Sequence, residues 1–169
     1  MPPSILSIAL AQPNGIATRL QVFGSKVADL RPFWRDVFGP WYFGKVQDIF
    51  TLEGQTRGAA GRFGGGHWAP LAAWYARWKS KNYPGRGILV LSGRLRNSVS
   101  WPWVQSGAWG IWQPQATSIT YGTKVPYAPK HQYGDPATHL PARPFMPPVD
   151  MNEFTPLLHK WVIREAGSL

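Results

Sequence analysis

Residues 25–50 read SKVADLRPFWRDVFGPWYFGKVQDIF, and this stretch decides how the chain folds. Its apolar side chains recur close to a helical period, at Val27, Leu30, Trp34, Val37, Phe38, Trp41, Val46, Ile49 and Phe50. This spacing predicts a long amphipathic helix that is capped by Ser25 or Asp29. Gly39 and Pro40 lie in its middle, and a proline there removes a backbone donor and clashes with the preceding turn. We therefore expect two helical halves joined by a kink near Gly39.

The N-terminal residues are predicted to form a β-hairpin. Residues 5–11 and 16–23 are largely apolar, and the segment Gln12-Pro-Asn-Gly15 separates them. Asn14-Gly15 is the dipeptide that favours a tight hairpin turn, because both central positions of that turn need positive φ.

Residues 53–67 are predicted to form a flexible loop. Six glycines lie between Gly54 and Gly66, and no hydrophobic period is present. The loop has neither the Gly-Lys-Ser/Thr ending nor the Gly-x-Gly-x-x-Gly spacing of nucleotide-binding loops. We therefore interpret it as a linker and not as a phosphate-binding loop.

The rest of the chain alternates short helices with extended segments. We expect a helix over 70–81, with Leu71, Trp74, Tyr75 and Trp78 on one side, and a helical turn within 91–99 capped by Ser92. Paired strands are expected at 108–112 and 117–121, a short helix at 127–133 ended by Gly134, an extended segment at 141–145 and an amphipathic helix at 154–165. The predicted fold class is α+β, in one domain over 1–169. An antiparallel sheet with the N-terminal hairpin is packed by the kinked long helix, the second helix and the C-terminal helix.

Composition excludes several kinds of protein. The chain of 169 residues contains no cysteine, which excludes disulfides, thiolate catalysis and cysteine-ligated zinc. No run of about 18 uncharged apolar residues is present, so we expect no membrane-spanning helix. The N-terminus lacks the basic start of a secretory signal, so synthesis in a cytoplasm is expected.

The net charge of +10 is concentrated in the middle of the chain. From Gly54 to Gly134 there is no Asp or Glu, whereas ten Lys and Arg are present; elsewhere eight cations balance eight acids. Such a block predicts an anionic partner, either DNA phosphates or an acidic protein surface, with a solvated basic face as the alternative. The residues that we expect to face DNA or a protein interface are Arg57, Arg62, Arg77, Lys79, Lys81, Arg94, Arg96, Lys124 and Lys130. The neighbouring aromatic residues either stack on single-stranded bases or, at their helix and strand spacings, pack the core.

One cluster has the composition of a metal site. His131, Asp135 and His139 provide ligands that suit zinc or iron. Gly134 and Pro136 would break any helix that aimed all three at one ion, so turn residues and a packed histidine are the preferred interpretation. Since no Gly-x-Ser-x-Gly turn is present either, we predict no catalytic residue, no cofactor, no metal and no enzymatic activity.

A series of short segments follows one order along the middle of the chain. They are Trp68-Ala-Pro-Leu71, Lys79-Ser-Lys81, Leu91-Ser-Gly-Arg-Leu-Arg96, Tyr121-Gly-Thr123, Tyr127-Ala-Pro-Lys-His-Gln-Tyr-Gly134 and Pro141-Ala-Arg-Pro-Phe145. In this order they resemble the phage virion morphogenesis (tail completion) family, which is related to the neck and tail-terminator proteins of tailed phages. The resemblance covers about residues 60–150, and neither the N-terminal part nor the aromatic segment 101–112 shares it.

The resemblance implies a structural protein without catalytic chemistry. It implies a homo-oligomeric ring, a hexamer, at the head–tail junction of the virion, which terminates the tail tube and joins it to the head connector. The implied partners are other copies of the chain, the tail-tube protein, the connector or neck proteins and genomic DNA in the lumen, with no membrane. Two alternatives remain: a stand-alone basic DNA-binding protein of phage packaging or recombination, and a metal-dependent hydrolase built on His131, Asp135 and His139.

Overall fold

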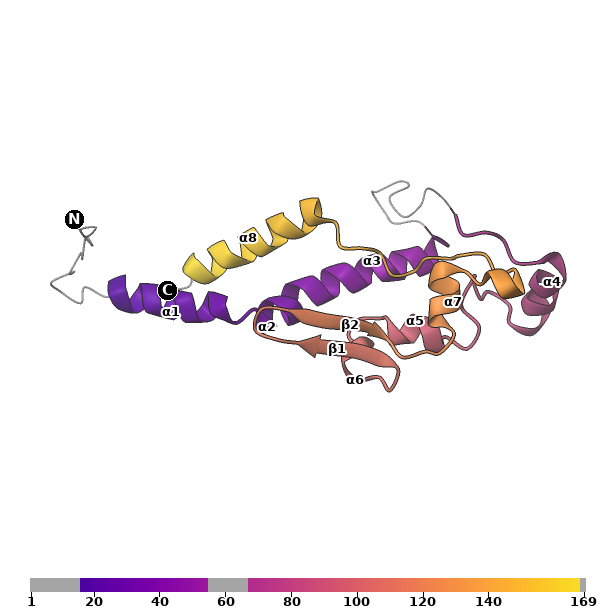
Figure 1. Ribbon diagram of the computed structural model, residues 1–169, viewed down its shortest axis with the longest axis horizontal. Coiled ribbons are helices and arrows are strands. Elements are labelled where there is room, and N and C mark those ends of the chain that lie inside the picture. Colours follow the sequence, from indigo (N-terminus) through magenta and orange to yellow (C-terminus); the bar gives the residue numbers. More distant parts are fainter. Residues whose placement is uncertain (1–15, 55–66, 168–169) are drawn as a thin grey trace, which may run out of the picture.

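The computed structural model describes residues 16–54 and 67–167, and it has the predicted mixture of helices and an antiparallel sheet (Figure 1). The helices are α1 (Ile16–Ala28), α2 (Arg31–Phe33), α3 (Gly39–Thr51), α4 (Ala73–Asn82), α5 (Arg94–Ser98), α6 (Trp103–Ser106), α7 (Ala128–Tyr133) and α8 (Met151–Gly167). A π-helical turn, η1 (Trp34–Phe38), joins α2 to α3, and a 3-10 turn, η2 (Pro136–Thr138), follows α7. The strands are β1 (Gly110–Pro114) and β2 (Ile119–Thr123).

The molecule is elongated, with α3 at its centre (Figure 1). Helix α8 lies along one side of α2 and α3, and the two-stranded sheet lies along the other side. Helix α1 is at one end and α4 at the opposite end. None of the helices within 16–54 and 67–167 has the length and apolar character needed to cross a lipid bilayer.

The predicted N-terminal hairpin is wrong in its second half. Residues 16–23, expected as a strand, belong to helix α1, and residues 1–15, which include the expected first strand, lie outside the described residues. Ile16, Leu20, Phe23 and Val27 recur every three or four residues, which is the period of a helix face. Helix α1 contacts α8, and its residues Phe23 and Val27 are half-buried, so packing against a helix distant in sequence favours the helical conformation here.

The expected irregularity near Gly39 is present, and it takes the form of the π-helical turn η1. The N–H of Gly39 bonds to the carbonyl of Trp34, five residues earlier. Pro40 has no N–H to donate, and the wider turn before it accommodates its ring without ending the helix. The predicted cap by Ser25 or Asp29 is wrong, because α1 continues to Ala28 and the N-cap position before Arg31 is Leu30, which makes no side-chain capping bond. The Asp29 carboxylate, one position earlier, accepts from the N–H of Arg31 at 3.0 Å, and the Ser25 hydroxyl donates to Val22 O within α1.

The predicted strand pair is confirmed with a shift of two residues. β1 and β2 are antiparallel, and Gly110 lies opposite Thr123 while Trp112 lies opposite Tyr121. A short turn closes the hairpin, in which Gln115 N–H bonds to Ser118 O at 2.8 Å. The hairpin is tied to the long helix by the indole of Trp34, which donates to Gln115 O at 3.1 Å.

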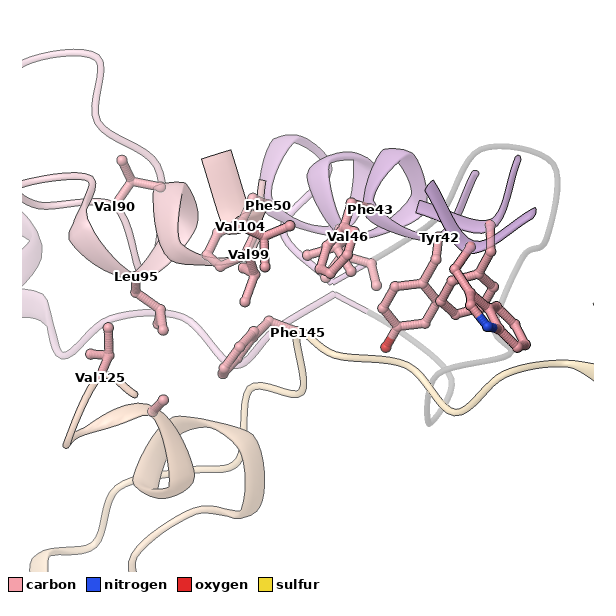
Figure 2. Packing of buried hydrophobic residues seen from close by; sticks show 14 of the residues in the cluster. Tyr42, Phe43, Val46, Phe50, Val90, Leu95, Val99, Val104, Val125 and Phe145 are labelled. Carbon is pink, nitrogen blue, oxygen red and sulfur yellow. The ribbon is translucent and has the colours of Figure 1, made fainter. Parts of the chain in front are cut away.

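The core is dominated by aromatic rings along α2, η1 and α3. Phe33, Phe38 and Phe43 are at most 2% exposed, and Tyr42 lies 4.7 Å from Tyr121 of β2 between ring centres. Figure 2 shows Tyr42, Phe43, Val46 and Phe50 on the α3 side of this core, with Val90, Leu95, Val99, Val104, Val125 and Phe145 packed around them. The inward face of the predicted helix 25–50 therefore forms the core.

The segment between α7 and α8 is held in place by side chains from three elements. Trp68 donates to Pro144 O at 2.8 Å, and the Tyr42 hydroxyl donates to Pro147 O at 2.6 Å. Gln132 on α7 accepts from the N–H groups of Phe145 and Met146 and donates to Met146 O, each at 3.0 Å. These bonds fix the extended conformation that the prolines predict, because its backbone has no sheet partner.

The contact of α3 with Trp101 predicts opposite effects for two glycine substitutions in one helix. A methyl group at Gly39 would lie within 2.7 Å of Cε3 of Trp101, whereas nothing lies within 4 Å at Gly44. We expect Gly39→Ala to lower the free energy of unfolding by about 1–2 kcal/mol, since overpacking exceeds the gain in helix propensity. Gly44→Ala should raise it by about 0.5–1 kcal/mol. Urea denaturation of both variants tests this, and equal effects would contradict the packing.

The three bonds of Gln132 predict that its amide is required. Gln132→Glu keeps the shape but cannot donate to Met146 O, and it places a charge in a half-buried site. We expect a loss of about 1–3 kcal/mol in the free energy of unfolding. Gln113→Glu makes the same chemical change at an exposed position of β1 and should be close to neutral. Similar unfolding midpoints for both variants would show that the amide bonds contribute little.

Candidate interaction surface

The structure separates the predicted basic residues into three groups. Arg57 and Arg62 lie outside the described residues. Arg96 is half-buried and Lys79 is buried. The exposed members are Arg77, Lys81, Arg94, Lys124 and Lys130.

Lys79 was predicted to lie at the surface, but its side chain is buried. Its side chain is 4% exposed, and its ammonium donates to Gly87 O at 2.5 Å. Burial lowers its pKa, and the charge of Glu53 partly opposes that shift. Sequence spacing placed Lys79 with Lys81, but the helix turns these two side chains to different sides.

Two of the exposed cations already have partners. Lys130 forms an ion pair with Asp135 at 2.7 Å. The guanidinium of Arg94 lies over the ring of Trp109, 5.0 Å from its centre. The charge of Arg94 therefore remains at the surface, and the contact with Trp109 fixes the orientation of its side chain.

The aromatic face of α4 is exposed, so of the two alternatives for the aromatic residues, core packing does not hold for the tryptophans of this helix. Trp74 is 69% exposed and Trp78 is 43% exposed. Their rings pack along the helix instead, with Tyr75 stacked on Trp78 at 5.4 Å and Trp78 next to Tyr83 at 5.6 Å. Helix α4 lies at the end of the molecule (Figure 1). The core residues Trp68 and Phe50 pack against each other, with 5.6 Å between their ring centres.

Other exposed aromatic residues lie on α6, on α7 and in the adjoining loops. Trp103 on α6 is 65% exposed, and Tyr133 at the end of α7 is 80% exposed. We call this set the aromatic surface: Trp74, Trp78, Tyr83, Trp103, Trp109, Tyr127 and Tyr133. Large exposed aromatic side chains are typical of sites that bind another molecule.

A pocket of about 940 Å³ opens between α4, the 89–95 segment, α7 and residues 138–143. Its lining contains the cations Lys79, Arg94 and Arg143, together with His131 and His139. No Asp or Glu lines it. The pocket therefore has a positive interior within the half of the molecule that carries the aromatic surface.

Arg143 is the pocket residue that sequence reasoning missed. It is 4% exposed, and its guanidinium donates to the carbonyls of Ala69 at 2.9 Å and Pro70 at 3.0 Å. Burial lowers its pKa, and no carboxylate among the described residues forms an ion pair with it. The sequence singled out its segment for Pro141, Pro144 and Phe145, and nothing in the spacing indicated that the arginine points inward.

The structure gives Asp135 a capping role instead of a ligand role. Its carboxylate accepts from Ala137 N–H at 3.2 Å at the start of η2 and pairs with Lys130, which lowers its pKa. His139 is exposed with a positive φ of 53°, and His131 packs against Tyr127. Within the described residues, no group of three His, Asp or Glu side chains is placed to hold a metal ion.

Comparison with known proteins gives no match. The chain matches no protein-family model, and no curated protein or solved structure is significantly similar to it. The functional argument therefore depends on the residues and their geometry.

His131 predicts a pH dependence of stability. Burial and the nearby Arg143 lower its pKa below the usual 6.5, so the folded state holds the neutral ring while the unfolded chain takes up a proton. The contribution of His131 to stability is complete above pH 6.5 and is lost as the pH falls below that value. We expect the decrease in free energy of unfolding from pH 7.5 to pH 5.5 to be smaller for His131→Gln than for the wild type. His159→Gln, at an exposed position of α8, should leave the decrease unchanged, and equal decreases in all three proteins would refute the assignment.

Proposed function

We propose that the protein is a structural component of a tailed phage virion, which forms a hexameric ring at the head–tail junction. The ring terminates the tail tube and joins it to the head connector. The resemblance of the segments between Trp68 and Phe145 supports this function, and the surface of the single chain supports an assembly role independently.

The observation that carries the proposal is the aromatic surface. Trp74, Trp103 and Tyr133 are 69%, 65% and 80% exposed in one chain. Exposed aromatic area on this scale is unfavourable in water, and tryptophan and tyrosine are enriched where protein interfaces are best packed. Their burial against a neighbour would stabilise an assembly of many copies.

The two ends of the molecule offer the two different patches that a ring requires. Each copy in a closed ring contacts its neighbours through two complementary surfaces. The part of the aromatic surface on α4 lies at one end of the molecule, and exposed apolar side chains on the elements at the other end include Val22 on α1 and Ile163 on α8, at 40% and 58% (Figure 1). In the proposed ring, one end of each copy packs on the opposite end of the next.

The basic residues suit the remaining partners. Arg77, Lys81 and Lys124 are exposed in a chain of net charge +10. In the proposed ring they face DNA in the lumen or an acidic surface of the tail-tube or connector protein.

A stand-alone DNA-binding protein is the second candidate. Its supporting observation is that Trp74, Tyr75 and Trp78 lie on the same helix as Arg77 and Lys81. Aromatic rings that stack on bases next to cations that bind phosphates form a typical surface for single-stranded DNA.

The ring predicts that assembly depends on the aromatic surface. We expect the purified protein to form a closed oligomer, alone or with tail-tube protein, and the double variant Trp74→Ser/Trp103→Ser to remain a monomer. Gln113→Ser, at an exposed site of β1, should assemble normally. Light scattering coupled to size exclusion gives the mass of each. A wild-type monomer under both conditions, with DNA binding that weakens steeply with salt, would favour the second candidate.

A further inference from the structure

We propose that the pocket between α4 and α7 binds an acidic side chain, an Asp or Glu next to an apolar residue, from a partner protein. The site belongs to the single chain, so the proposal holds or fails separately from ring formation.

The pocket has buried positive charge without a matching negative charge. Arg143 and Lys79 are each 4% exposed, and the pocket lining contains no carboxylate. All eight Asp and Glu of the chain lie in the described residues, because residues 1–15, 55–66 and 168–169 contain none. None of the eight forms an ion pair with Arg143, Lys79 or Arg94 in the structure. A buried cation is costly unless an opposite charge accompanies it, so the pocket favours an incoming anion.

The charge of Glu53 does not fill this role. Glu53 attracts Lys79, but it accepts from Ile88 N–H at 2.8 Å and does not line the pocket. Among the described residues, the guanidinium of Arg143 has the carbonyls of Ala69 and Pro70 as its acceptors. Its charge is therefore the least compensated in the pocket.

An unused donor or acceptor lies in the same wall. Nδ1 of His131 is buried and has no hydrogen-bond partner among the described residues. Buried polar atoms of side chains are rarely left without a partner. The His131 ring lines the pocket, so a carboxylate bound there would lie beside this ring, and it would meet the exposed guanidinium of Arg94.

The shape of the pocket favours a protein side chain over the backbone of a nucleic acid. Arg143 and Lys79 are recessed, whereas phosphate contacts in nucleic-acid complexes use accessible cations along a groove. Leu71, Trp74 and Leu91 add apolar wall beside the charges. The flexible side chain of an Asp or Glu can reach the recessed cations, and an apolar residue next to it can pack on the apolar wall of the pocket.

The acids of a second copy are already engaged. Five of them form ion pairs within the chain, with Arg31, Arg35, Lys45, Lys130 and Arg164. Glu53 and Asp150 accept from backbone N–H groups of Ile88 and Asn152, and Asp48 also has an interaction within the chain. The occupant is therefore a different protein with an acidic segment.

Binding to a peptide panel tests the proposal. The probes are labelled heptapeptides with a central Asp or Glu and varied apolar flanks, each paired with the same peptide carrying Asn or Gln. Fluorescence anisotropy with the full chain should show acidic peptides that bind at least about tenfold more tightly than their amide partners. Arg94→Glu should reduce this binding about tenfold or more, because it reverses a charge at the mouth of the pocket.

The control makes the same charge change away from the pocket. Lys160→Glu, at an exposed position of α8, should bind the peptides like the wild type. Equal losses in both variants would mean that only net charge matters, and equal binding of acid and amide peptides would exclude a carboxylate site; either result overturns the proposal.

Two further measurements separate the sources of binding. The side-chain NMR signals of His131 should shift on addition of an acidic peptide that binds, while those of His159 should not. An oligothymidine that competes with the peptides and loses affinity in Arg94→Glu, with no acidic peptide selected, would overturn the proposal in favour of DNA. Ring mass measured for Arg94→Glu distinguishes the two proposals, since loss of peptide binding in an intact ring leaves the assembly function standing.

Discussion

The packing of aromatic rings on the helix that runs from α2 to α3 is the constraint on which the rest of the structure depends. Tyr42 is at the centre of it, with Phe38 stacked at 5.4 Å and Tyr121 at 4.7 Å. Its hydroxyl is satisfied by Pro147 O, and burial raises its pKa, so it stays neutral. One side chain thus joins the long helix, the sheet and the segment before α8. The π-helical turn allows this row of rings to continue past Pro40.

The same packing builds the pocket. Phe145 is 2% exposed and contacts Phe50 of α3, and Gln132 fixes its backbone. Arg143 precedes Phe145 by two residues in this extended segment and reaches back to Ala69 and Pro70. Because the core fixes the position of Phe145, the guanidinium has little freedom. The positive charge in the pocket is therefore held by the hydrophobic core and not by a counter-ion.

Much of the fold can be predicted from local sequence patterns. The predictions are wrong where contacts between residues distant in sequence determine the structure. The helical period from Arg31 to Thr51, the strand pair and the end of α7 at Gly134 are confirmed, because each depends on neighbours in sequence. The predicted helix start at Ser25 or Asp29 is wrong, since α1 continues to Ala28. The strand expected at 16–23 is a helix, since its contact with α8 is not visible in sequence. The tryptophans on α4 are exposed because this helix lies at the end of the molecule, a position that its helical spacing does not reveal. Lys79 and Arg143 had no local signal of burial, so the pocket was not predicted.

The pairing of charges within the chain explains why the residues between Gly54 and Gly134 have an excess of positive charge that no carboxylate compensates. Among the residues that the structure describes, four of the five ion pairs join residues at most five apart in sequence, such as Asp29 with Arg31 and Asp36 with Arg35. The hydrogen bonds to Arg31 lower the pKa of Asp29 to about 2, so this carboxylate is ionised and can pair with Arg31 at physiological pH. A carboxylate that is paired with a neighbour in sequence does not compensate the charge of a distant Lys or Arg. The block between Gly54 and Gly134 contains no Asp or Glu of its own. Lys130 of this block pairs with Asp135, but the other described cations of the block form no ion pair with an Asp or Glu of the chain. Solvent ions or another molecule therefore balance their charge, and solvent ions do so less well where the cations are buried.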